Sequence, residues 1–479
     1  MELKFKPYEQ TQIVLFPNNI EELIPDNHLV RAIDIIVEQL DLSELYRSYS
    51  EEGQPAYHAK MLLKILFYGY SIGERSSRKL ASRMEYDVFF MYLAGMQKPD
   101  FRTISDFRKN KISYLKNYFK QVLLLCRELG IASLGHISID GTKMEANSSR
   151  RMLKERDELE KLEIKIEQKI RDIIESAEKI DKEEDGKYGR KKRGDELPKE
   201  LGKREKFLEK IKKAKQYLED KKLKRVNITE PDSRLMKTNT SGKDICYNAQ
   251  AVVDSDKQVI VACKVISEEA DNYEFKPMYK EAIKNTNKKP GEVSADAGYY
   301  SGETYMFIEK KKINAYVPDS RFNTETDKEG NELIKKYDRR NFKYAEENDS
   351  YICPEGKGLR YKKNSSRNGV KFKIYEGSSC KQCKVREECI SKESADFRQI
   401  QIYENDKFKA EMRAKLHTLE GKKKYSKRMI TIEPVFAHLK RIMNFNRFLL
   451  RGIEKVNLEF SLLCTAYNIK KLSKHLVLH

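Results

Sequence analysis

The sequence predicts a multidomain α/β protein with a mixed sheet at its centre. Three observations lead to this class. The chain has 479 residues, more than one hydrophobic core usually organises, so about two to four domains are expected. Strand-like runs end on carboxylates at Asp140 and Asp296. Segments with helical periodicity and a short cysteine-rich stretch surround these runs, and they predict an N-terminal helical domain, an inserted helical hairpin and a small cysteine-rich insertion.

Residues 1–130 are expected to form the N-terminal helical domain. Apolar side chains recur there at spacings of three and four residues, as at Leu29, Ile33, Ile36, Val37 and Leu40. Thr103 and Asp106 predict the start of one long helix that runs towards Leu129. The basic side chains of the domain favour DNA binding, with a helical dimerisation or packing domain as the alternative. They are Arg75, Arg78, Lys79, Arg83, Arg102, Arg108 and Lys109.

The central α/β core is expected in three parts, residues 131–149, 226–335 and 401–479. Gly135–Asp140 is predicted to be its first strand, with the aspartate at the point where the strand gives way to a glycine-containing turn. Two further strands, Cys246–Val253 and Gln258–Ile266, flank a polar turn and predict a hairpin. Val293–Asp296 is the next strand and again ends on an aspartate.

A helix that reaches about Asn287 is expected between the hairpin and the last of these strands. Asp271 and Glu274 precede it and are interpreted as turn or cap residues. Asp254 and Asp256 receive the same interpretation. The resulting order of strand, strand, strand, helix and strand places the carboxylates at a common edge of an α/β sheet.

Residues 150–225 interrupt this core with a Lys/Glu-rich segment. A narrow apolar seam at Leu159, Leu162, Ile166, Ile170 and Ile173 resumes at Phe207, Ile211 and Leu218, after a break between Asp185 and Pro198. The pattern predicts two long helices in an antiparallel hairpin. The hairpin is either a solvated insertion or an arm that touches DNA or a second subunit.

Residues 336–400 form the predicted cysteine-rich insertion. Cys353, Cys380, Cys383 and Cys389 fall within a short basic segment, and one pair has the CxxC spacing. This set suggests a tetrahedral Cys₄ structural zinc site of the ribbon or knuckle kind. Reduced cysteines without metal are the alternative. The other four cysteines, Cys126, Cys246, Cys263 and Cys464, lie in apolar contexts and are interpreted as small buried side chains.

The third carboxylate of interest, Glu433, is predicted to open a long amphipathic helix that begins near Thr431, because Pro434 is tolerated in a first turn. At 3.6 residues per turn, the apolar arc contains Val435, Phe436, Leu439, Ile442 and Met443. The opposite arc contains Glu433, Lys440, Asn444 and Arg447, with Arg441 at its margin. A carboxylate at one end of a basic stripe can meet a metal ion while the bases contact phosphates. An ordinary surface face is the alternative.

The formal net charge of +20 favours a polyanionic partner, and nucleic acid is the natural candidate. The N-terminal residues lack an apolar run of signal-peptide length, and no run approaches the length of a membrane span. We therefore expect a cytoplasmic, nucleoid-associated protein with reduced cysteines and no membrane partner.

Tyr425, Arg428, Glu433 and Lys440 together resemble the Tyr-Arg-Glu-Lys signature of DDE transposases encoded by bacterial insertion sequences. The spacings from Tyr to Arg and from Glu to Lys match it, whereas the Arg-to-Glu interval is one residue longer. Blocks that are similar to one branch of these enzymes cover nearly the whole chain. They are Pro99–Thr103, Ile139–Thr142, Tyr247–Gln250, Ala295–Tyr299 and Glu433–Phe436.

The resemblance implies a ribonuclease H-like catalytic core in which Asp140, Asp296 and Glu433 are the catalytic triad. The three carboxylates would hold two Mg²⁺ ions, for which Mn²⁺ can substitute. The enzyme would cleave double-stranded DNA at element terminal repeats and transfer the 3′-hydroxyl into target DNA, as a homodimer. Contacts to DNA are expected from Tyr425, Arg428, Lys440, Arg441 and Arg447. Two alternatives stay open: a catalytically inactive or repurposed DNA-binding protein, and a metal-dependent nuclease that cleaves without joining.

Overall fold

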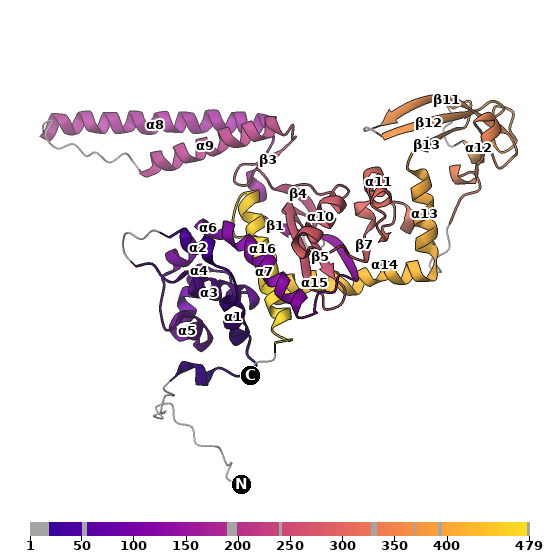
Figure 1. Cartoon of the computed structure of the whole chain (residues 1–479). Coiled ribbons are helices and arrows are strands. Elements are labelled where there is room, and N and C mark those ends of the chain that lie inside the picture. The colour runs from indigo at the N-terminus through magenta and orange to yellow at the C-terminus, as the bar shows by residue number, and fades with distance from the viewer. Residues whose placement is uncertain are drawn as a thin grey trace, which may run out of the picture. The chain divides into compact units, whose positions relative to one another are not determined.

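The computed structural model describes residues 19–49, 55–188, 199–238, 242–326, 333–367, 370–390 and 395–476 (Figure 1). Two segments discussed above lie outside these ranges. They are the N-terminal residues 1–18 and most of the break predicted between Asp185 and Pro198. The chain forms two compact units. The first unit contains residues 1–131, 438–445 and 458–479, and the second contains residues 132–437 and 446–457. Within the described ranges no helix combines the length and the apolar content needed to cross a membrane.

The first unit is helical. Its elements are α1 (Leu29–Glu38), α2 (Ser43–Arg47), α3 (Ala59–Ser71), α4 (Ser77–Tyr86), α5 (Val88–Ala94), α6 (Phe101–Asn110) and α7 (Ile112–Glu128). The predicted single helix from Thr103 towards Leu129 is wrong, because the chain breaks at Lys111 between α6 and α7. The N-cap is Asp100, whose carboxylate accepts a hydrogen bond from the Thr103 amide at 2.8 Å. The periodicity in α1 does mark its buried face.

The second unit contains a six-stranded mixed sheet. Its strands are β1 (His136–Glu145), β4 (Arg234–Thr238), β5 (Gly242–Asp254), β6 (Ile260–Ile266), β7 (Glu292–Ala295) and β8 (Ala315–Tyr316). The order along the sheet is β4-β5-β1-β7-β8, and β6 also pairs with β5. β5 runs antiparallel to both β1 and β6, whereas β1, β7 and β8 are parallel. This arrangement confirms the mixed α/β class predicted from the sequence.

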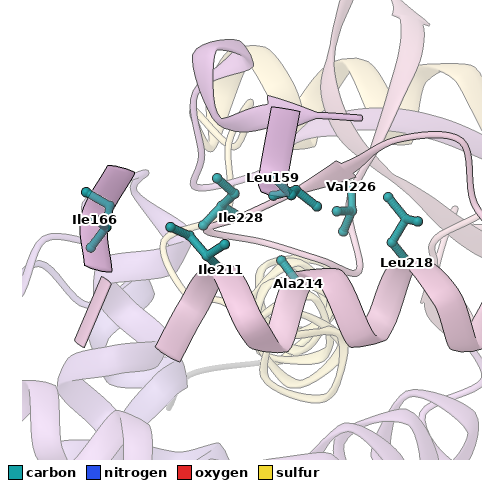
Figure 2. Close-up of a cluster of buried hydrophobic side chains, with 7 residues drawn as sticks. All are labelled: Leu159, Ile166, Ile211, Ala214, Leu218, Val226 and Ile228. Carbon is teal, nitrogen blue, oxygen red and sulfur yellow. The ribbon is translucent and has the colours of Figure 1, made fainter. Parts of the chain in front are cut away.

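Two long helices follow β1 after the short strand β2 (Leu153–Lys154). α8 (Arg156–Tyr188) and α9 (Lys199–Asp220) lie antiparallel, since Lys215 pairs with Glu163 and Lys212 with Glu167. Apolar side chains at their base form a buried cluster with the residues of and after β3 (Val226–Asn227), as Figure 2 shows. The cluster contains Leu159, Ile166, Ile211, Ala214, Leu218, Val226 and Ile228.

A second, five-stranded sheet lies between β8 and the C-terminal helices in the chain. It consists of β9 (Lys343–Ala345), β10 (Ser350–Ile352), β11 (Gly358–Arg367), β12 (Val370–Gly377) and β13 (Gln399–Tyr403). All of its neighbouring strands are antiparallel, in the order β13-β12-β11-β10-β9. The short helix α12 (Arg386–Cys389) precedes β13.

The C-terminal region is helical. Its elements are α13 (Asp406–His417), α14 (Leu419–Thr431), α15 (Glu433–Ala437) and α16 (Ile453–Leu472). The predicted helix from Thr431 through Arg447 is wrong. α15 begins at Glu433 and passes into a π-helical turn, His438–Ile442, in which the Met443 amide bonds the His438 carbonyl. Asn444 then adopts φ 48°, in the left-handed region, and the helix ends before it.

Candidate functional site

Asp140 lies in the middle of β1 and not at its end, which corrects the predicted strand boundary. β1 continues to Glu145 because residues 140–145 all pair with β5. Gly141 belongs to the strand, where a Cβ would lie 2.3 Å from the Gln250 amide nitrogen and 3.0 Å from an Asp271 carboxylate oxygen. The glycine is therefore explained by the close approach of neighbouring side chains to the backbone.

Asp296 directly follows β7 and begins a 3₁₀ turn, Ala297–Tyr299. Its carboxylate accepts a hydrogen bond from the Gly298 amide at 2.9 Å. β1 and β7 are parallel neighbours, and Ile139 pairs with Ala295. Since each aspartate follows one member of that pair, the register brings Asp140 and Asp296 to the same level of the sheet.

Arg428 joins the first carboxylate to the third. It projects from α14, which packs against β1 and β7, and its Nη1 donates to Asp140 Oδ2 at 2.9 Å. Its Nη2 lies 3.7 Å from Glu433 Oε1. The side chain of Glu433 is 50% exposed, whereas that of Asp140 is 14% exposed. Tyr425, one turn earlier on α14, lies with its ring centroid 5.9 Å from the Arg428 guanidinium carbon.

The electrostatics show that the two aspartates are close and poorly solvated. Burial and the neighbouring Asp296 charge raise the pKa of Asp140 to about 7, against the opposing effect of Arg428. Burial also raises the pKa of Asp296, which Arg428 lowers and Asp271 raises. A cation at this position therefore favours the ionised form of both carboxyl groups.

Asp271 is the residue that sequence reasoning missed. The sequence predicts a turn or cap role for it. The Glu274 amide does bond the Asp271 carbonyl in a turn, but Glu274 occupies the N-cap of α10 (Phe275–Thr286), and the Asp271 side chain contacts β5 of the sheet. Its Oδ1 accepts hydrogen bonds from the side-chain amides of Asn248 and Gln250, both at 2.6 Å. Gln250 in turn accepts from the Tyr299 hydroxyl. The sequence signal for this role is the Tyr247–Gln250 block. The side-chain amides of Asn248 and Gln250 in β5 need hydrogen-bond acceptors, and a nearby carboxylate such as Asp271 can supply one.

Three further residues predicted for the site follow α15 in the chain. Arg447 lies after the helix, where its guanidinium donates to the carbonyls of Ala146 and Ser148 at 3.1 and 3.0 Å. Lys440 and Arg441 lie in the π-helical turn, which groups with the first unit, whereas Asp140, Asp296 and Glu433 belong to the second. The predicted arc of Glu433, Lys440 and Arg447 does not extend to Arg447, because the helix ends before Asn444.

The four cysteines of the predicted zinc site line one small pocket. Cys353, Cys380, Cys383 and Cys389 surround it together with Leu359, Val385 and Ile390. The Lys357 amide donates to Cys353 Sγ at 3.3 Å and the Arg398 amide to Cys380 Sγ at 3.4 Å. Burial and the other three cysteines raise the pKa of the Cys389 thiol. No group of three or more His, Cys, Asp or Glu in the described ranges is already arranged around a common metal position.

Comparison with protein families gives two matches. The Transposase DDE domain matches residues 352–473, a range that contains Arg428 and Glu433 but neither Asp140 nor Asp296. The Transposase domain (DUF772) matches residues 18–110 in the helical first unit. No curated protein and no solved structure matches the chain. Both family matches support a transposase function, and together they indicate an insertion-sequence DDE transposase family.

Proposed function

We propose that the protein is an active DNA transposase, which cleaves DNA at element ends and joins the freed 3′-hydroxyl to target DNA. The observation that carries the proposal is the parallel register of β1 and β7, which sets Asp140 beside Asp296 while α14 brings Arg428 to them. The order β6-β5-β1-β7-β8 supports a ribonuclease H-like core. We also propose that the domains end where the sequence predicts, at residues 130, 149, 225, 335 and 400.

Asp140, Asp296 and Glu433 are proposed to hold two divalent cations, Mg²⁺ or Mn²⁺. The donor set fits a hard cation because it consists of carboxylate oxygens, two of them destabilised by their own burial and mutual repulsion. When bound, the ions would activate the attacking oxygen and stabilise the leaving one. Until then Arg428 would offset only part of the effect of burial, which raises the pKa of both aspartates. The buried Nε of Arg428 has no hydrogen-bond partner among the described residues.

The remaining residues of the site are proposed to contact DNA. Tyr425 and Arg428 lie beside the carboxylates and would touch the strand near the cut. Lys440, Arg441 and Arg447 would contact phosphates farther along. Because two element ends are joined in one reaction, we propose a homodimer on DNA. The helical first unit is proposed to recognise the element end.

The cysteine pocket is proposed to hold one structural Zn²⁺. Four thiols around one pocket supply the ligand number and type that tetrahedral zinc requires. Burial, and to a lesser extent the neighbouring thiols, raise the pKa of the Cys389 thiol, and a bound cation would lower it.

The decisive test is a cleavage-and-joining assay on a labelled duplex that carries the element's own end, with Mg²⁺, Mn²⁺ or chelator. Wild type is expected to give cut and joined products that need metal, and Asp140→Asn to give neither. Cutting without joined product would identify a nuclease. Tight, salt-sensitive DNA binding without cutting under any metal would identify a DNA-binding protein of transposase descent.

A further inference from the structure

On one face of the five-stranded sheet, tyrosines are followed along the strands by lysines. Cross-strand partners share a face, so the register groups Tyr361 with Tyr375 and then Asn364 with Lys373. The next pair, Ser366 and Lys371, continues the row towards the β11–β12 turn. An open trough lies along this face, with Tyr344 and Tyr351 from β9 and β10 on its wall.

Hydrogen bonds hold the rings of the trough in place. The hydroxyls of Tyr344 and Tyr375 both donate to Asp349 Oδ1, at 2.9 and 2.6 Å. Tyr351 packs between these two residues, with ring centroids 5.0 and 4.8 Å away. Tyr344 lines the trough and is 48% exposed although its hydroxyl is satisfied. Tyr361 lies beside the trough, with its ring centroid 5.9 Å from that of Tyr375, and is 42% exposed. Both residues therefore present aromatic surface to solvent.

The positive charge of the β11–β12 hairpin favours a negatively charged partner. Residues 358–377 contain six Lys or Arg and one Glu. Lys373 lies 3.8 Å from Asp349 and 6.0 Å from the Tyr361 ring, while Lys371 is exposed and forms no ion pair with a carboxylate of the described residues. Exposed rings beside lysines are the arrangement that binds unpaired nucleotides, with bases on the rings and phosphates on the cations.

We propose that this trough binds a single-stranded segment of the DNA substrate. Tyr344 and Tyr361 would stack with bases, and Lys371 and Lys373 would pair with phosphates. The inference rests on the proposed function, because it assigns the trough to the DNA substrate of that reaction. It adds a binding surface that lies outside the carboxylate site and the Tyr-Arg-Glu-Lys signature.

The test uses the full-length protein in chelator and a fluorescent oligothymidine, with binding followed by anisotropy over a salt series. Tyr344→Leu/Tyr361→Leu is expected to weaken binding by about tenfold or more. Lys371→Gln/Lys373→Gln is expected to reduce the slope of log affinity against log salt by about 1.4. Lys363→Gln is the matched control, since Lys363 lies on the same hairpin but pairs with Ile374 on the opposite face. Circular dichroism of each variant verifies its folding.

Binding by both trough variants that equals binding by Lys363→Gln would overturn the proposal. This outcome is distinguishable from failure of the proposed function. If the proposed function is wrong, wild type neither cuts nor joins the element end, whatever the trough variants bind. If wild type does both and the trough variants bind oligothymidine as the control does, only the trough is refuted.

Discussion

The acidic site on the six-stranded sheet and the cysteine pocket beside the five-stranded sheet hold their side chains in different ways. Asp140 and Asp296 are fixed by strand register and meet a cation from within the chain, Arg428. The cysteines lie on turns and on a helix of four residues, and the pocket that they line contains no carboxylate except Glu355. Strand register therefore fixes the two aspartates relative to each other, whereas the cysteine pocket has no such register, and we expect its structure to depend more strongly on the proposed metal. The following predictions test that difference.

The largest effect is expected for Glu433→Gln. Its side chain is half exposed, so the neutral amide should leave folding unchanged. Loss of a proposed metal ligand should lower the rate of strand cleavage by at least about a hundredfold. Rates from the labelled-duplex assay and a melting curve together check this. Cleavage at the wild-type rate would remove Glu433 from the site.

Cys383→Ser is expected to change local folding, in contrast to Glu433→Gln, which should change the cleavage rate and leave folding unchanged. Zinc content, measured by elemental analysis of purified protein, should fall from about one ion per chain towards zero. The five-stranded sheet should become protease-sensitive while α14 and the six-stranded sheet stay protected. Cys263→Ser, in β6, is the control because Cys263 does not line the pocket. Unchanged zinc in Cys383→Ser, or none in wild type, would refute the zinc assignment.

Arg428→Gln sharpens the electrostatic half of the comparison. Arg428 lowers the pKa of both Asp140 and Asp296, so its loss should raise both values. Higher pH is then needed to ionise the carboxyl groups. The acidic limb of the metal-dependent cleavage profile should therefore move up by about one pH unit. A lower cleavage rate at every pH without a shift of the acidic limb would show that Arg428 contacts DNA and does not lower the pKa of the carboxyl groups.

The smallest effect is on the stability of the metal-free protein. The pKa of Asp140 is about 7 in the folded protein and about 3.9 when unfolded. Because the folded value is raised, ionisation destabilises the fold progressively as pH rises from about 4 to 7. Asp140→Asn should therefore melt above wild type at pH 8, by a few degrees, with the difference shrinking towards pH 5. Equal differences at both pH values would contradict the raised pKa.

The sequence predicted those elements that depend on local pattern. Periodicity identified the buried face of α1, and the run before Asp296 marked the end of β7. It failed where distant residues decide the structure. β1 continues through Gly141 because β5 pairs along it, and the helix after Glu433 widens and ends before Asn444. Asp271 could be placed only once β5 and the following loop were seen together.

The most direct test of the account is a titration of bound Mn²⁺ by electron paramagnetic resonance in the full-length protein. Wild type should bind Mn²⁺ at the acidic site, and Asp140→Asn, Asp296→Asn and Glu433→Gln should each lose that binding. Cys383→Ser should retain it. Equal Mn²⁺ binding by wild type and all three carboxylate variants would contradict the claim that these side chains converge on one metal centre.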